Sequence, residues 1–339
     1  MRKPGVTQKE VAERAGVAQA TVSLVLNGGR DKVSPETAER IEAAIADLGY
    51  QPNRFAQALR TQRTHVIACV VPDLANPFYP SLVVAVQRVA RAAGYEVITI
   101  DTEGQAGNER QVVAAASQGR FDGIVGVFFN LGVKELAPLG KAGVPLVRIE
   151  VSRKTGGALP IDDLFIDNEA AARALTEHLL DLGHRSVAMI AAPRGPQQVR
   201  VRGYLDAMAS IGAEPFVLEA ANFTVEGGRN TTDSLLAGNR PVTAIIAAND
   251  LMAIGVMQSI IAHGLSIPHD ISVAGFDDIL ASALVTPPLT TVAQFQDQLG
   301  TRAAERLLAR LASSTIEPGG AEEMRFELII RASIAAPRP

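Results

Sequence analysis

The chain has 339 residues, more than one hydrophobic core usually supports, so we expect at least two domains. Its apolar runs are shorter than the roughly 18 uncharged residues of a membrane helix, and its polar N-terminus lacks an export signal, which argues against a membrane or secreted protein. Residues 1–65 carry 10 Lys or Arg against 7 Asp or Glu, whereas the rest of the chain carries 22 against 29, an asymmetry that hints at nucleic acid near the N-terminus.

The first fifty residues predict three short helices. Thr7, with a glutamate three residues later, forms the capping-box pattern that starts a helix, and Gly16 is typical of its end. A second helix is predicted over residues 19–27, followed by two glycines, and Ser34 with Pro35 starts a third. Three helices this short form a core only by packing on one another.

Residues 51–64 contain too few apolar side chains for a core of their own, so they predict a linker that could become helical on binding. From His65 onward, apolar strands alternate with amphipathic helices, and after a Gly/Pro break the alternation begins again. This pattern predicts the α/β class, with two parallel-sheet subdomains of similar size. Ligands of such sheets bind at the carboxyl ends of the strands, so we expect a cleft between the subdomains.

Several hydrogen-bonding residues fall where this pattern predicts strand ends. Asp277 follows ISVAGF, Asn249 follows AIIAA and Glu150 ends PLVRIE, while Arg200 lies near the start of a helix. Carboxylates, an amide and a guanidinium that can each bond twice suit the vicinal hydroxyls of a sugar. Turn capping or exposure to solvent is the alternative role for any one of them.

Signatures of catalysis are missing from the sequence. It contains no GxSxG, HExxH, P-loop or GxGxxG motif, and its five histidines have no metal-ligand spacing. His184, in the turn LGHRSV, is expected to cap backbone, and the single cysteine, Cys69, is expected to be buried in the strand HVIACVV. We therefore predict no catalytic residues, no metal, no cofactor and no enzymatic activity.

The segment TQKEVAERAGVAQATVSLVLN at 7–27 closely resembles the helix-turn-helix of the lactose-repressor and galactose-repressor (LacI/GalR) family of bacterial transcription regulators. The resemblance continues in order through the whole chain, including QPNRFAQAL, NPFYPSLV, HLLDLGHRSVAMIA and GLSIPHDISVAGFDD. It implies a helix-turn-helix headpiece, a hinge helix and a periplasmic-binding-protein-like sensor. The implied boundaries are 1–50 for the headpiece, 51–64 for the hinge and 65–339 for effector binding and dimerisation, with an N-subdomain of 65–163 and 293–321 and a C-subdomain of 164–292 and 322–339.

The resemblance implies that the second helix enters the major groove of DNA. The implied contacts are Gln19, Ala20, Thr21, Ser23 and Leu24 to bases, and Thr7 and Asn27 to the DNA backbone. Gln19 can pair with adenine, whereas Ala20 offers only an apolar contact. Two departures from the family pattern alter the expected readout: Ala18 replaces a capping Ser or Thr, and Leu24 replaces a polar residue. A purely structural three-helix bundle is the alternative.

In the linker, PNRFAQAL matches the family's hinge helix, which enters the minor groove. The implied contacts are Asn53, Arg54, Ala56, Gln57 and Leu59, of which Leu59 would wedge between base steps and kink the duplex. The alternative is an ordinary linker whose leucine docks on its own sensor domain.

The resemblance also implies an effector site between the subdomains. Its predicted residues are Phe78, Tyr79, Glu150, Arg194, Arg200, Phe223, Asn249, Asp277 and Gln294. Arg200 matches the sugar-binding branch of the family and Arg194 roughly matches the purine-binding branch. The pattern favours a sugar or sugar derivative over a nucleobase.

The predicted protein is therefore a cytoplasmic, nucleoid-associated regulator without membrane contact. We expect a homodimer that binds a pseudo-palindromic operator and is controlled allosterically by a small-molecule effector, with repression favoured over activation. A dimer is favoured over a tetramer because the chain ends after ELIIRASIAAPRP without a heptad helix. The rival classes are a solute-binding protein of a transport system and an α/β enzyme that modifies sugars or nucleotides.

Overall fold

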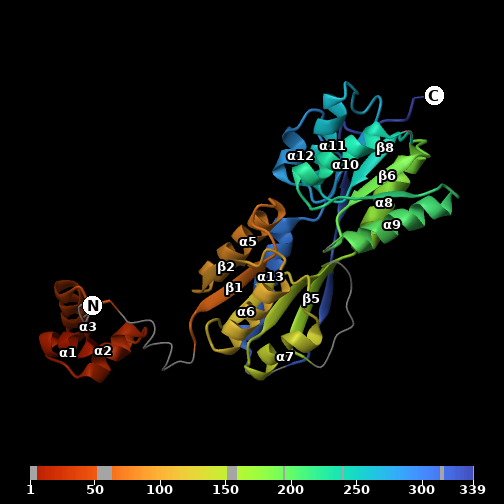
Figure 1. The fold of residues 1–339 in the computed structure, drawn as a ribbon. Helices are drawn as coiled ribbons and strands as arrows, with labels where there is room; N and C mark the ends of the chain where they lie inside the picture. The colour runs from red at the N-terminus through yellow and green to blue at the C-terminus, as the bar shows by residue number, and fades with distance from the viewer. Residues whose placement is uncertain are drawn as a thin grey trace. The chain divides into compact units, whose positions relative to one another are not determined.

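The computed structural model describes residues 6–51, 63–150, 159–193, 195–238, 240–313 and 317–338. It divides into two compact units, residues 1–64 and residues 65–339 (Figure 1). Within the described ranges, no helix is long and apolar enough to cross a membrane. Six predicted contact residues lie outside the described residues: Asn53, Arg54, Ala56, Gln57, Leu59 and Arg194.

The N-terminal unit consists of short helices whose ends are fixed by local sequence. Its elements are α1 (Gln8–Ala15), α2 (Gln19–Leu26), the 3-10 turn η1 (Arg30–Lys32) and α3 (Pro35–Leu48). Thr7 and Glu10 cap the start of α1 reciprocally, and Gly16 ends it with a left-handed φ of 64°. Ser34 caps α3 by accepting a hydrogen bond from the backbone N–H of Thr37 at 3.2 Å. The predicted start and end signals of these helices are confirmed.

An apolar core holds the three helices together. Its buried members are Val11, Ala12, Ala15, Val22, Ile41, Ala44 and Tyr50. Two exposed ion pairs, Arg14–Asp47 at 2.6 Å and Arg30–Glu42 at 2.7 Å, add little stability because solvent screens them. Packing therefore fixes the orientation of α2 and leaves its outer face uncovered within this unit.

The first lobe of the second unit is built on a six-stranded parallel sheet, in the order β11-β5-β4-β3-β1-β2. The strands are β1 (Val66–Val71), β2 (Glu96–Asp101), β3 (Gly123–Gly126), β4 (Leu146–Glu150), β5 (Ile161–Ile166) and β11 (Ala321–Met324). Helices α5 (Phe78–Ala92) and α13 (Gln296–Ala312) cover one face, and α6 (Ala106–Ser117) and α7 (Val133–Lys141) cover the other. Figure 1 shows α5 and α13 side by side.

The second lobe has a four-stranded parallel sheet, in the order β7-β6-β8-β9. The strands are β6 (Val187–Ala191), β7 (Phe216–Glu219), β8 (Ala244–Ala247) and β9 (Ser272–Ala274). Helices α8 (Asn168–Asp181) and α9 (Gln197–Ser210) pack on one face, α10 (Val225–Ala237) and α11 (Asp250–Ala262) on the other, and the short α12 (Leu280–Leu284) follows β9. Glycines allow α10 and α11 to approach closely, because a Cβ on Gly255 would lie 1.9 Å from the carbonyl oxygen of Val225.

Three crossings connect the two lobes. The chain leaves the first lobe after β5, returns through β10 (Thr291–Ala293) into α13, and crosses again from β11 to β12 (Glu327–Ile329). Strands β10 and β12 pair antiparallel. Each lobe thus contains segments that are distant in sequence, and both sheets present the carboxyl ends of their strands near the crossings. The predicted fold class is confirmed.

Two residues outside the cleft match their predicted roles. Cys69 is fully buried in β1, and burial raises the pKa of its thiol to about 12. The His184 Nε2–H donates to the carbonyl oxygen of Ala335 at 2.8 Å, and burial lowers the pKa of its imidazole. The first is a packing residue, and the second joins the α8–β6 turn to the C-terminal segment.

Candidate effector cleft and DNA-reading helix

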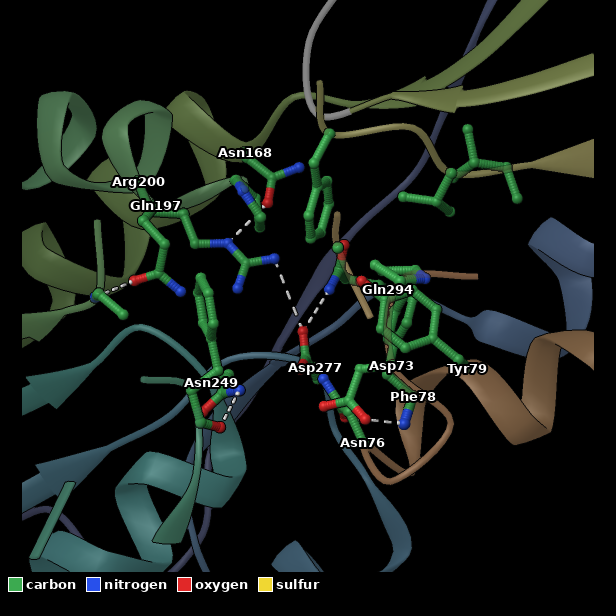
Figure 2. Close-up of a pocket in the computed structure, with 18 of the residues that line it drawn as sticks. Asp73, Asn76, Phe78, Tyr79, Asn168, Gln197, Arg200, Asn249, Asp277 and Gln294 are labelled. Atoms are coloured by element: carbon green, nitrogen blue, oxygen red, sulfur yellow. Dashed lines mark hydrogen bonds and ion pairs between the residues drawn. The ribbon is translucent and has the colours of Figure 1, made fainter. Parts of the chain in front are cut away.

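A cavity of about 530 Å³ lies between the two lobes (Figure 2). This volume is within the range of small-molecule sites. All the described residues of the predicted effector site line it: Phe78, Tyr79, Glu150, Arg200, Phe223, Asn249, Asp277 and Gln294. The fold therefore brings together side chains from both lobes and from a crossing.

Arg200 lies on α9 with only 4% of its surface exposed. Its Nε–H donates to Asn168 Oδ1 at 2.7 Å, its Nη1 donates to the carbonyl oxygen of Ala248 at 2.5 Å, and its Nη2 lies 3.6 Å from Asp277 Oδ1. The guanidinium also stacks 3.6 Å from the centre of the Phe276 ring. Burial lowers the pKa of the Arg200 guanidinium, and the negative charge of the nearby Asp277 raises it in part. These contacts hold a charged donor group at the wall of the cleft.

Asp277 follows β9 and faces Arg200 in the same cleft. The Gln294 amide donates to its Oδ1 at 2.6 Å. Burial raises the pKa of the Asp277 carboxyl to about 7, although Arg200 and Gln294 both lower it. The residue has a φ of 124°, a conformation that costs free energy for a residue with a side chain. A strained backbone and a buried carboxyl with a raised pKa at one position are typical of a binding site.

Asn249 connects β8 to α11 and supports another wall of the cleft. Its Oδ1 accepts a hydrogen bond from the backbone N–H of Met252 at 2.8 Å, which caps α11. Its Nδ2 donates to the carbonyl oxygen of Phe223 at 3.2 Å and so fixes the loop that carries this aromatic ring. Asn249 thus both caps a helix and lines the cleft, two roles that the sequence analysis treated as alternatives.

Glu150 ends β4 and enters the cleft beside a buried arginine. Arg148 lies on the same face of β4, and its Nε is 3.0 Å from Glu150 Oε1. Its Nε and Nη2 donate to the two carboxylate oxygens of Asp163 at 2.8 and 3.0 Å. The guanidinium neutralises part of the negative charge on the two carboxylates. It also fixes the orientation of the Glu150 carboxylate at the wall of the cleft.

Aromatic side chains line the opposite part of the cavity. The rings of Phe78 and Tyr79, in the first turn of α5, lie 5.1 Å apart in an edge-to-face arrangement. Asn76 Oδ1 accepts a hydrogen bond from the backbone N–H of Phe78 at 3.1 Å and fixes this turn. Burial raises the pKa of the Tyr79 hydroxyl, so it remains a neutral hydrogen-bonding group. Phe223 adds a ring from the second lobe.

The cavity also contains polar residues that the sequence analysis did not identify. They are Asp73, Asn76, Asp101, Glu103, Asn168, Gln197 and Asn222. Asp101 ends β2 and Asn168 begins α8 after β5, so the rule that ligands bind at strand carboxyl ends could have found both. Gln197 carried no such signal, because a glutamine in the first turn of a helix is normally exposed.

The outer face of α2 presents the residues predicted to read DNA. Gln19, Ala20 and Leu24 are exposed, and Thr21 and Ser23 are half-buried. The predicted effect of Ala18 is confirmed, because the start of α2 has no side-chain cap.

The two residues predicted to contact the DNA backbone make hydrogen bonds within the headpiece. The Thr7 hydroxyl donates to Glu10 Oε2 at 2.8 Å as part of the capping box. The Asn27 amide donates to the carbonyl oxygen of Ser23 on α2. Both residues are nevertheless exposed.

A helix-turn-helix unit followed by a two-lobed sensor with a polar cleft defines the class of ligand-responsive transcription regulators. Two family models match the chain: "Bacterial regulatory proteins, lacI family" over residues 7–53 and "Periplasmic binding protein-like domain" over residues 176–334. The chain belongs to the lacI family of bacterial regulatory proteins. It is thus a transcription regulator and not an enzyme, and the family predicted from the sequence is confirmed.

Individual relatives match over nearly the whole length. The ribose operon repressor of Escherichia coli (strain K12) is 33% identical over 317 residues, covering 92% of this chain and 94% of the relative. The HTH-type transcriptional repressor PurR of Glaesserella parasuis is 32% identical over 338 residues, covering 97% and 98%. A crystal structure of the lac repressor dimer bound to operator and the anti-inducer ONPF has a TM-score of 0.86 at 29% identity, covering 98% of this chain and all of that one.

Proposed function

We propose that the chain is a cytoplasmic repressor that binds a pseudo-palindromic operator as a homodimer and changes its operator affinity when a neutral sugar occupies the cleft. Residues 1–50 would read the operator, 51–64 would form the hinge, and 65–339 would bind the effector and pair with a second copy. The subdomain bounds expected from the sequence, 65–163 with 293–321 and 164–292 with 322–339, would each move by three residues, because β5 and β11 pair over their whole length within the sheet of the first lobe. The observation that carries the proposal is the set of buried hydrogen-bonding groups that converge on the cleft.

The charge of the cleft supports an uncharged, hydroxyl-rich effector. Among the described lining residues, five carry a carboxyl group and one, Arg200, carries a guanidinium; the five are Asp73, Asp101, Glu103, Glu150 and Asp277. Carboxylates accept hydrogen bonds from hydroxyl groups but repel phosphate. The rings of Phe78 and Phe223 offer apolar faces to the C–H surfaces of a sugar. A neutral sugar satisfies both requirements, whereas a sugar phosphate does not.

Relatives support two effector classes. The name of the Escherichia coli relative refers to the ribose operon, which agrees with a sugar. The partial match of Arg194 to the purine-binding branch of the family keeps a second class in view, and the aromatic lining of the cleft would also suit a flat base. The excess of carboxylates favours the sugar, because a purine presents fewer donors than a polyhydroxylated ring.

For the DNA side of the function, we propose that α2 reads the major groove and that the hinge enters the minor groove. Gln19, Ala20, Thr21, Ser23 and Leu24 would contact bases, and Thr7 and Asn27 would contact the DNA backbone. The exposure of Gln19 and Ala20 supports this assignment. Leu59 would wedge between base steps, with Asn53, Arg54, Ala56 and Gln57 as its minor-groove neighbours.

Exposed apolar side chains on α12 support pairing of two copies. Leu280 and Leu284 lie one helical turn apart and are 78% and 72% exposed. Two large leucines on one helix face are an apolar surface of the kind that protein contacts bury. We propose that this surface takes part in the homodimer.

A thermal-shift experiment on the full chain tests the effector class. The compounds are D-ribose, D-xylose, D-galactose, ribose 5-phosphate, adenine and hypoxanthine. A ligand at 100 times its Kd adds about 2.7 kcal/mol to the stability of the state it binds, which raises the unfolding temperature measurably. We expect stabilisation by a neutral sugar and none by ribose 5-phosphate. Stabilisation by the purines or the phosphate alone would contradict the proposal.

A further inference from the structure

Gln197, the first residue of α9, has an unusual environment for a glutamine in the first turn of a helix. It is only 1% exposed, and it lines the cleft. Its Oε1 accepts a hydrogen bond from the backbone N–H of Ala192 at 2.8 Å. Among the residues that the structure describes, its Nε2 has no hydrogen-bond partner. A buried amide nitrogen without a partner is costly unless something else accepts its hydrogens.

The orientation of this amide follows from its surroundings. A flipped amide would point its NH₂ group at the backbone N–H of Ala192 and place two donors against each other. The oxygen must therefore face Ala192 and the nitrogen must face away from it. Figure 2 shows the nitrogen on the side of Arg200. Gln197 and Arg200 lie three residues apart on α9, so both present donors from the same face of this helix.

We propose that Gln197 is a specificity-determining residue that donates a hydrogen bond from Nε2 to an oxygen of the effector. Most of the described charged groups in the cleft are carboxylates, which require donors on the ligand. Gln197 and Arg200 require an acceptor on the part of the ligand that lies against α9. The effector thus presents donors to the carboxylates and an acceptor oxygen, such as a ring oxygen or hydroxyl, to the start of α9. This inference rests on the proposed function, because it assumes that a small molecule fills the cleft.

The substitution Gln197→Glu separates ligand binding from a structural role. One oxygen of the new carboxylate still accepts the hydrogen bond from the Ala192 N–H. The other oxygen replaces Nε2, so an acceptor replaces a donor at the position that faces the ligand. Gln198→Glu is the matched control, because the neighbouring Gln198 is exposed and the change adds the same charge to the same helix turn. Gln197→Met is a second variant, which adds no charge and removes both the Nε2 donors and the Oε1 acceptor for the Ala192 N–H.

The measurement is calorimetric titration of the full chain and its variants with D-ribose, D-xylose, D-galactose, adenine and hypoxanthine. For whichever compound binds the unsubstituted chain, we expect Gln197→Glu to weaken binding roughly 10- to 100-fold and Gln197→Met about 10-fold. Gln198→Glu should bind like the unsubstituted chain. If Gln197→Glu does not fold, Gln197→Met alone decides the result.

The outcomes distinguish this proposal from the proposed effector class. Unchanged affinity in Gln197→Glu, or in Gln197→Met where the first variant does not fold, would show that Gln197 only supports the backbone at Ala192 and would overturn the inference. Binding of a purine alone, weakened by both variants, would contradict the sugar effector and still support the role of Gln197. If no compound binds the unsubstituted chain, both proposals fail.

Discussion

The headpiece and the cleft achieve order in opposite ways. In residues 6–51, helix caps and a small apolar core fix the fold, and the exposed residues of α2 take no part in that core. In the cleft, Asp277 and Arg200 are almost completely buried, and Asp277 has a strained backbone. The surface proposed to read DNA can therefore be changed without disturbing its scaffold, whereas the groups proposed to bind the effector are part of the scaffold itself.

The largest expected effect comes from separating the two regions. Deleting residues 1–64 should abolish operator binding, because the remaining unit is acidic and has lost the helix that presents donors to the groove. Effector affinity should not change, because every described cleft residue lies beyond residue 64. Gel-shift and calorimetric titrations of the two chains measure both effects. Specific operator binding by residues 65–339 would contradict the assignment.

A smaller effect is expected from breaking the buried charge pair in the cleft. Asp277→Ala should weaken effector binding about 100-fold, because it removes an acceptor and takes the neighbouring negative charge away from the buried Arg200 guanidinium. Asp297→Ala is the control, because that carboxylate pairs with Arg88 on the exposed surface. Calorimetry is the measurement. Equal effector affinity in the two variants would place the binding site elsewhere.

The smallest predicted effect is a dependence on pH. The pKa of Asp277 is raised to about 7 by burial, so the unliganded chain loses stability as the pH rises through 7 and the carboxyl ionises. A hydroxyl that donates to Asp277 binds the ionised form, so effector affinity should be up to about tenfold stronger at pH 8 than at pH 6. Asp277→Asn should remove this dependence. If the effector affinity instead falls from pH 6 to pH 8, the effector binds the protonated carboxyl, and Asp277 donates the hydrogen bond rather than accepting it.

The same contrast explains what could be predicted from the sequence. The headpiece signals are local: Thr7 with Glu10, Gly16 and Ser34 fix helix ends within a few residues, and the structure has each helix where it was expected. The cleft was located by a general rule, because parallel strands bring their carboxyl ends to one edge. That rule placed Asn249 and Asp277 correctly in the cavity.

What sequence reasoning missed depends on contacts between distant segments. The predicted subdomain boundary between residues 163 and 164 falls inside β5, whose two adjacent carboxylates, Asp162 and Asp163, are typical of a polar loop. Both are buried, and their partners are Arg310 for the first and Arg148 for the second. Gln197 was missed for a similar reason, since only the fold reveals that its amide is buried. Whether a charged segment forms a strand, or an amide lacks a hydrogen-bond partner, depends on residues far away in the sequence and is therefore known only from the fold.

If the cleft controls operator binding, the effector and the operator must change each other's affinity, and a reciprocal binding measurement tests this most directly. A duplex selected in vitro from random pseudo-palindromes is titrated with the full chain, with and without a saturating amount of the stabilising sugar, and the sugar is titrated with and without the duplex. We predict that each ligand changes the affinity for the other by the same factor, roughly 5- to 150-fold. Identical operator affinity with and without the sugar, despite sugar binding, would contradict control of the headpiece by the cleft.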